Sequence, residues 1–457
     1  MKKILLSIFA FASLSPAICQ KQSYTPAELK RIADLGRIWG MVNYFHPAMG
    51  TGKINTGDLV VKYAEALAAN PSAENFKVVV NKMLGMLNDP STNLSAQART
   101  DSALLFKSNK EDAAVHKLAS GYWYIALPTL AVSNTNIMAI PGMLPDQWDT
   151  AKGIIMDLRN VIPKAFTDYD FMFDALPLLQ AKLAGNSPLP GAYERVVFHN
   201  GLVPQEDGEN SVHYSGWKTI TRATTATQVK MPGLSTPYNK PFAVVVNSGT
   251  SLDLLKRLLS LRAAGKCLVV YEGSGPGYAP GKILKIPVAD AQIFNLRTSD
   301  LVFGENDPAP APDMIINKIT DFSEDGSFLQ QCVALLNKGL PAGITGNNPL
   351  SLKYVIPRFE DTQTGFMVST GYRLFALYNH WNAIQYFFPY KHLLQKDWNN
   401  ILEEHLPAFI QAKDSVEYNF ALRKMIAEIH DSHGFFRSPK GTTPVRYELG
   451  SWPAIDV

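Results

Sequence analysis

The segment FAVVVNSGTSL, residues 242–252, decides the fold that the sequence predicts. Its five leading apolar residues predict a buried strand, and the leucines at helical spacing over residues 252–264 predict an amphipathic helix directly after it. The apolar run at residues 267–271 predicts a second strand. A strand, a helix and a strand in this order require a crossover connection, so we expect parallel strands covered by helices.

The same alternation of strand and helix extends toward both ends of the chain. Strand-like runs occur at residues 122–127 and 153–158, and helical patterns occur around residues 171–183 and 327–337. The stretch 186–238 is richer in Gly, Pro, Ser and Thr, so we expect it to be an excursion over the surface. We therefore predict an α/β core at residues 98–340, with a mostly parallel sheet flanked by helices.

A repeated helical pattern precedes and follows this core. Each copy has Arg, Leu, Trp, Tyr-Phe and Pro at the same spacing: Arg31, Leu35, Trp39, Tyr44, Phe45 and Pro47, then Arg373, Leu377, Trp381, Tyr386, Phe387 and Pro389. The first copy closes on Asp89-Pro90-Ser91 and the second on Asp431-Ser432-His433. We predict small helical units at residues 21–97 and 371–437. A linker with short strands is expected at 341–370, and an irregular tail at 438–457.

The N-terminus has the pattern of a secretory signal peptide. Two lysines precede an apolar run at residues 4–14, and the small-residue stretch after it predicts cleavage near Cys19 or Gln20. The apolar run is too short to span a bilayer. We therefore predict a signal peptide at residues 1–20 and an exported, periplasmic or extracellular protein without a transmembrane segment. Lipid attachment at Cys19 is the alternative, and the bulky Ile18 before it disfavours that.

Composition limits the classes of partner. Hydrophobic residues make up 46% of the 457 residues and charged residues 18%, which is typical of a globular protein. A net charge of +3 without a basic stripe disfavours a nucleic-acid partner. The histidines lack the paired spacing of a zinc site, so no metal and no cofactor are predicted. Cys267 and Cys332 are expected to be buried free thiols, with a disulfide as the alternative. The oligomeric state stays open.

Four motifs in a fixed order resemble the C-terminal-processing (tail-specific) serine peptidases, especially the branch of the tricorn core peptidase. They are the helical unit with its closing Asp, the strand KGIIMDLRN at 152–160, the corner VVVNSGTS at 244–251, and LRTSD at 296–300 with Pro312-Asp313. The resemblance implies an α/β peptidase fold and a serine nucleophile at the first turn after the strand. It also implies partners that are unfolded or C-terminal polypeptide segments, bound by strand addition.

The chain departs from that pattern where the chemistry is expected. The nucleophile position, counted from Asn247, falls on Leu252, which cannot attack a carbonyl. Ser251 is one residue away, and one helical step turns a side chain by about 100 degrees. The glycines that the resemblance implies after the 152–160 strand are replaced by residues 160–163, which end in Pro163 without an N–H. The lysine base of the tail-specific branch would fall near Gly277.

The base of the tricorn-like branch is a His in the pair that closes the helical unit. Ser91 stands there in the first copy, whereas Ser432-His433 is intact in the second. The leading hypothesis is an inactive peptidase-like protein that binds extended peptides. One alternative is an active serine peptidase that uses Ser251 or Ser248 with His433 as the base. A further alternative is a scaffolding protein without a peptide groove, in which Leu252 packs against Val161.

Overall fold

The computed structural model describes the helices and most of the strands. The described residues are 23–54, 56–96, 114–126, 131–132, 147–159, 173–174, 189–204, 213–223, 240–247, 250, 252–273, 281–303, 309–320, 322–323, 326–343, 353–355 and 369–430. Contacts group the chain into two compact units. One is made of residues 1–37, 57–79 and 362–457, and the other of residues 38–56 and 80–361.

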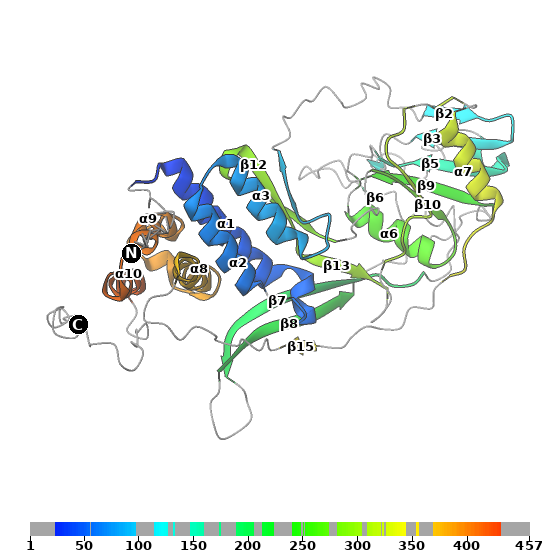
Figure 1. Ribbon diagram of the computed structural model, residues 1–457. Coiled ribbons are helices and arrows are strands. Elements are labelled where there is room, and N and C mark those ends of the chain that lie inside the picture. The colour runs from blue at the N-terminus through cyan, green and yellow to red at the C-terminus, as the bar shows by residue number, and fades with distance from the viewer. Residues whose placement is uncertain are drawn as a thin grey trace, which may run out of the picture. The chain divides into compact units, whose positions relative to one another are not determined.

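A six-stranded sheet forms the centre of the second unit (Figure 1). Its strands, in spatial order, are β14 Met314–Ile316, β10 Leu268–Glu272, β9 Phe242–Asn247, β5 Gly153–Asp157, β3 Tyr122–Ala126 and β2 Ala114–Lys117. Every neighbouring pair is parallel except β2 with β3. The mostly parallel sheet is therefore as predicted.

One helix covers each face of this sheet. Helix α6 Leu252–Ala263 packs its leucines on the side chains of Ile154, Val244 and Val246. Helix α7 Ser327–Asn337 packs on the opposite face of the sheet. There it contacts the alternate residues of the same strands, such as Ile155 and Val245. Because both faces are buried, each central strand is a continuous apolar run without alternation. This explains why the runs at 153–158 and 242–246 could be recognised from sequence.

Two larger antiparallel sheets also belong to the second unit. The order in one is β13 Ser299–Val302, β7 Tyr193–Pro204, β8 His213–Ala223 and β15 Lys353–Val355. The order in the other is β1 Asn93–Ala96, β12 Gln292–Arg297 and β11 Ile283–Val288. The excursion expected at 186–238 therefore contains a regular pair of strands, β7 and β8, which the sequence analysis did not predict. These strands pair at ten positions, with a bulge between His199 and Leu202. Contacts between paired side chains stabilise the two strands, although their amino-acid composition is typical of a loop.

The helix expected around residues 171–183 is also wrong where the structure describes it. Residues Phe173–Asp174 form β6, which pairs antiparallel with β4 Ala131–Val132. The alternation of Phe171 and Phe173 fits a strand as well as a helix, so periodicity over a few residues did not decide between them. The rest of that stretch lies outside the described residues.

Helices make up the first unit. It contains α2 Gly57–Ala69, α8 Thr370–Phe387, α9 Trp398–Gln411 and α10 Ser415–Ala427, while α1 Pro26–Phe45 and α3 Ala73–Gly85 contribute residues to both units. Carboxylate caps start two of these helices. The carboxylate of Asp397 accepts from Asn399 N at 2.9 Å, and that of Asp414 accepts from Glu417 N at 2.8 Å. The starts of α9 and α10 are therefore encoded locally.

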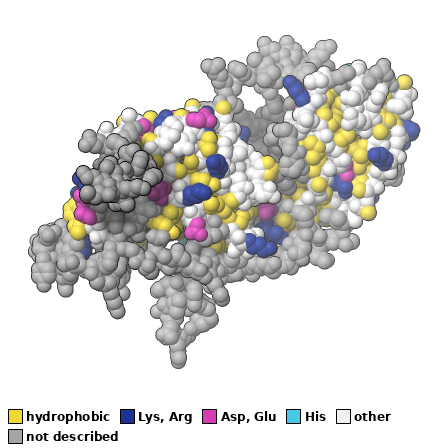
Figure 2. Space-filling model, viewed as in Figure 1, with side chains coloured by type: hydrophobic (Ala, Val, Ile, Leu, Met, Phe, Trp, Pro, Cys, Tyr) yellow, Lys and Arg dark blue, Asp and Glu magenta, His cyan; other side chains and the backbone are white. Residues whose placement is uncertain are grey.

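The surface and the thiols agree with the composition. On the face shown in Figure 2, the Lys and Arg side chains of the described residues are scattered and do not form a stripe. Cys267 and Cys332 are both buried and free, which confirms the thiol prediction. Within the described part of the chain, no helix is both long enough and apolar enough to cross a membrane.

Candidate functional site

The corner between β9 and α6 is the first candidate, because the resemblance predicts the nucleophile there. Asn247 ends β9, and its N–H donates to Thr250 Oγ1 at 3.0 Å while Thr250 N donates to Asn247 O at 3.1 Å. These bonds close a turn that leads into α6. Leu252 is the first residue of that helix and is half-buried. The predicted nucleophile position is thus a leucine at a helix start, while Ser248 and Ser251 lie outside the described residues.

An arginine crosses the sheet edge beside this corner. Asp157 ends β5 and Glu272 ends β10, and these strands are the two neighbours of β9. Arg159 binds Asp157 through Nε and Nη2, the latter at 2.7 Å, and its Nη1 lies 2.7 Å from Glu272. An arginine held by the ends of both neighbours lies across the carboxyl end of β9. In open α/β sheets, ligands bind outside that edge.

Further contacts fix this arginine. The Tyr124 hydroxyl donates to Asp157 Oδ2 at 2.6 Å, and the ring of Phe322 lies 5.5 Å from the centre of the guanidinium. Burial, followed by the Asp157 charge, raises the pKa of Tyr124. Burial opposes the charge of Arg159, but its bonds to Asp157 and Glu272 outweigh this and raise its pKa. Both carboxylates are therefore partners of one permanent cation.

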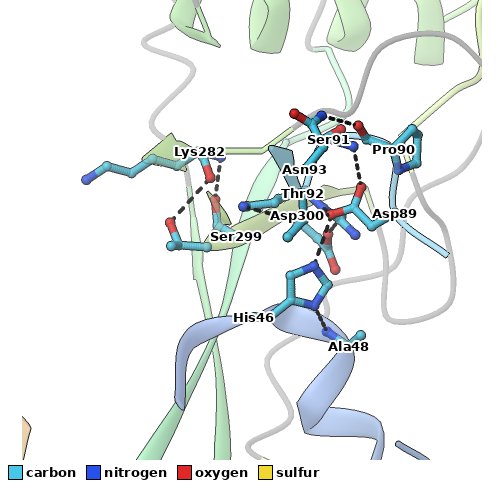
Figure 3. Close-up of polar contacts among 12 residues, drawn as sticks. His46, Ala48, Asp89, Pro90, Ser91, Thr92, Asn93, Lys282, Ser299 and Asp300 are labelled. Carbon is cyan, nitrogen blue, oxygen red and sulfur yellow. Dashed lines mark hydrogen bonds and ion pairs between the residues drawn. The ribbon is translucent and has the colours of Figure 1, made fainter. Parts of the chain in front are cut away.

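A second polar cluster joins the end of α1 to the loop after α3 (Figure 3). The ring of His46 caps η1 Pro47–Thr51, because its Nδ1 accepts from Ala48 N at 3.2 Å. That bond leaves the proton on Nε2, which donates to Asp89 Oδ2 at 3.0 Å. Asp89 also accepts from Thr92 Oγ1 at 2.7 Å and from Arg297 Nε at 2.9 Å.

The cluster stabilises the charged form of Asp89. Burial opposes ionisation of Asp89, but the His46 hydrogen bond and the Arg297 charge outweigh it and hold the pKa of Asp89 well below its usual range. His46 is 0% exposed, so its ring does not reach a substrate. Sequence reasoning took His46 as an isolated histidine. One feature of the sequence could have drawn attention to it: His46 lies inside the first copy of the repeat, and the equivalent residue of the second copy is Phe388.

An edge strand next to this cluster presents backbone groups. Among the described strands, β11 pairs only with β12. Thr298 N donates to Lys282 O at 2.8 Å, and backbone groups alternate in direction along the strand. The backbone N–H and C=O groups of residues 284, 286 and 288 therefore point toward β12, and the backbone groups of Ile283, Lys285 and Pro287 point to the open side. Pro287 lacks an N–H and lies on the open side, as prolines in sheets do. Ile283 and Leu284 are 40% and 41% exposed. In Figure 3 the Lys282 side chain points away from the polar cluster.

His199 provides a prediction about pH. It is buried beside the rings of Tyr44 at 4.9 Å and Trp217 at 5.5 Å, and burial lowers its pKa to about 4. The unfolded chain, with a pKa near 6.5, binds more protons between these values, so stability is lost as the pH falls from about 6.5 to about 4. Between these pH values the parent chain should lose up to about 3 kcal/mol of its free energy of unfolding because of His199, and the H199F variant should not show this loss. Urea unfolding at several pH values measures both. A slope equal to that of the parent chain would contradict the prediction.

The other site predictions fall outside the described residues or find no cluster. Ser432 and His433 are not described, nor are residues 160–163. Over the described ranges, no group of three or more His, Cys, Asp or Glu side chains could hold a metal ion. Sequence reasoning singled out Leu252, and the strand 152–160 that it quoted contains Asp157 and Arg159, which the structure brings together.

Comparison with known proteins gives only structural likenesses. No protein-family profile and no curated protein sequence matches the chain. A lipoprotein from Streptococcus agalactiae is 13% identical with a TM-score of 0.34, covering 70% of this chain and 99% of that one. A candidate peptidase from Parabacteroides merdae is 12% identical with a TM-score of 0.40, covering 67% and 96%. The photosystem II D1 C-terminal processing protease is 12% identical with a TM-score of 0.29, covering 64% and 94%.

Proposed function

We propose that this chain is an exported protein with the architecture of tail-specific, tricorn-like serine peptidases, and that it binds extended polypeptide segments without cutting them. The observation that carries the proposal is Leu252, which begins α6 at the end of the central strand. A corner of this kind suits a nucleophile, because free helical N–H groups can stabilise a developing oxyanion. A leucine at this position removes the attacking group.

The surroundings of the corner support the absence of cleavage. Arg159 crosses the carboxyl end of β9, and it occupies both carboxylates that end the neighbouring strands. The buried His46 lies beside Asp89, and its two ring nitrogens are engaged by Ala48 and Asp89. A general base needs a free lone pair within reach of the proton that it removes.

The open side of β11 is the proposed place for the peptide. A peptide paired there would accept from the N–H groups of Ile283 and Lys285 and donate to the carbonyls of Ile283, Lys285 and Pro287. Backbone bonds of this kind require little of the peptide's side chains. The exposed side chains of Ile283 and Leu284 point to opposite faces of the sheet, so successive apolar residues of the peptide could cover one each.

Fluorescein-labelled β-casein, an unstructured chain, tests binding and cleavage together. We expect it to bind the full chain, measured by fluorescence anisotropy, and to remain intact on a gel. The K285P variant removes one outward N–H without removing a β11–β12 bond, so Kd should rise about tenfold with little change in melting temperature. The K285A variant keeps the N–H and should bind as the parent does, whereas L284P removes an inward bond and should lower the melting temperature.

The same experiment separates the rival functions. Cleavage of casein, together with labelling by a fluorophosphonate probe that S251A abolishes, would establish the active peptidase. Absence of binding by a folded chain would favour the scaffolding protein. Equal binding by K285P and K285A would place the peptide elsewhere than on β11.

A further inference from the structure

The two helical copies match at a constant distance along the chain. Every bound of α10 is that of α3 plus 342, and α1 and α8 end at Phe45 and Phe387, which are also 342 positions apart. The match includes the backbone beyond the third helix. Asn88 and His430 are 342 positions apart, and both have a φ of 48°, a value that residues other than glycine rarely adopt.

Equivalent side chains make equivalent contacts within each copy. Trp39 Nε1 donates to Thr56 Oγ1 at 3.0 Å, and Trp381 Nε1 donates to Trp398 O at 2.8 Å. Thr56 and Trp398 are again 342 positions apart and stand at the start of the second helix of each copy. Arg31 and Arg373 both donate to carbonyls at the end of that helix. The repeat is therefore structural as well as sequential.

The copies also contact each other at equivalent positions. Gly36 of α1 and Tyr378 of α8 are 342 positions apart, and a Cβ at Gly36 would lie 2.2 Å from the Tyr378 ring. The hydroxyl of Tyr378 donates to Ile32 O at 2.8 Å, and the residue is 0% exposed. A contact between a position and its own counterpart is what a local two-fold axis produces.

Flanking contacts follow the same arrangement. Arg37 of α1 binds Glu403 and Asn399 O, both on α9. Gly371 of α8 lies against the backbone of Val61 on α2. Val61 and Glu403 are equivalent positions, so the first helix of each copy contacts the second helix of the other. Helices α8 to α10 thus occupy the position of a second subunit against α1 and α2.

We infer that Gly36 and Tyr378 form a hole-and-knob pair that makes the two copies pair within one chain. Two first copies placed together would bring glycine against glycine and leave the space of a phenol ring unfilled. Two second copies would bring one fully buried ring against another, with no room for both. Only the mixed pair fills the contact, and the mixed pair is present in every single chain. The partner of the α1–α2 surface is therefore the α8–α10 segment of the same molecule.

A swap of the two residues in the full chain tests this inference. Either single variant, G36Y or Y378G, should lower the melting temperature of the helical unit by on the order of 10 °C. The double variant G36Y/Y378G exchanges hole and knob, and the introduced hydroxyl would face Leu374 O, the counterpart of Ile32 O. Its melting temperature should regain more than half of the decrease caused by the single variants. Light scattering should give the mass of a monomer. A double variant no more stable than the weaker single variant would overturn the inference.

A control swap separates local symmetry from general tolerance. Lys30 and Tyr372 are also 342 positions apart on the same two helices, and Lys30 binds Asp34 of its own helix. The effects of K30Y and Y372K should add in the double variant, because these positions are not the crossing point. Coupling as strong as that between positions 36 and 378 would contradict the hole-and-knob pair. The Y378F variant removes only the hydroxyl and should lose a small part of the effect of Y378G.

Discussion

Replacement of Arg159 by methionine is expected to lower the free energy of unfolding of the sheet-containing unit by about 3–5 kcal/mol. The guanidinium is the shared partner of Asp157 and Glu272, and all three side chains are largely buried. Without it, two carboxylates remain at the sheet edge with no opposite charge between them. The loss can be measured by urea denaturation followed by tryptophan fluorescence, because Trp123 lies in β3 of the same sheet.

Neutral replacements of the partners provide the control. The triple variant D157N/R159M/E272Q removes all three charges, so it should be more stable than R159M alone although it has more substitutions. The R159K variant keeps a positive charge but not the planar fork, and we expect an intermediate loss. If R159M and the triple variant unfolded at the same urea concentration, the bridge across β9 would not be the source of the effect.

Replacement of Asp89 by alanine should destabilise the same unit by a similar amount, about 3–5 kcal/mol. The carboxylate accepts from His46, Thr92 and Arg297 and from the backbone N–H of Ser91, and the alanine variant leaves these four donors without this acceptor. Asp149 is exposed, so the matched variant D149A should change the free energy of unfolding by less than about 0.5 kcal/mol.

The pH dependence identifies the cause of the Asp89 effect. The folded pKa of Asp89 lies below its ordinary value, so its contribution is present above the unfolded pKa of about 3.9 and is lost as the pH falls below it. The parent chain should therefore lose more stability on acidification than D89A does. Equal acid slopes for the two chains would show that the hydrogen bonds of Asp89 do not depend on its charge.

The α/β core could be predicted because its strands are buried on both faces. Continuous apolar runs such as those of β5 and β9 arise from that burial, and the leucine spacing of α6 marks the helix that covers one face. The β7–β8 ribbon could not be predicted in the same way. Its stability comes from pairing between strands, and its content of Gly, Ser and Thr is that of a loop.

The site was predictable only where position along one element decides it. Leu252 could be located because a nucleophile position is counted from the strand end that precedes it. The pair of His46 and Asp89 joins residues 43 positions apart, and the loop after α3 brings them together only in the folded unit. Arg159 and Glu272 are likewise far apart in sequence, with β6 to β9 and α6 between them, so the bridge across β9 depends on strand order.

The spacing between the two helical copies has a consequence for synthesis. Helix α1 leaves the ribosome before its partners Tyr378 and Glu403, which follow more than 340 residues later. At ordinary rates of translation this interval is roughly 20–70 s. During that time α1 lacks the contacts of both residues, so the packing of the helical unit is completed only after α9 has been made.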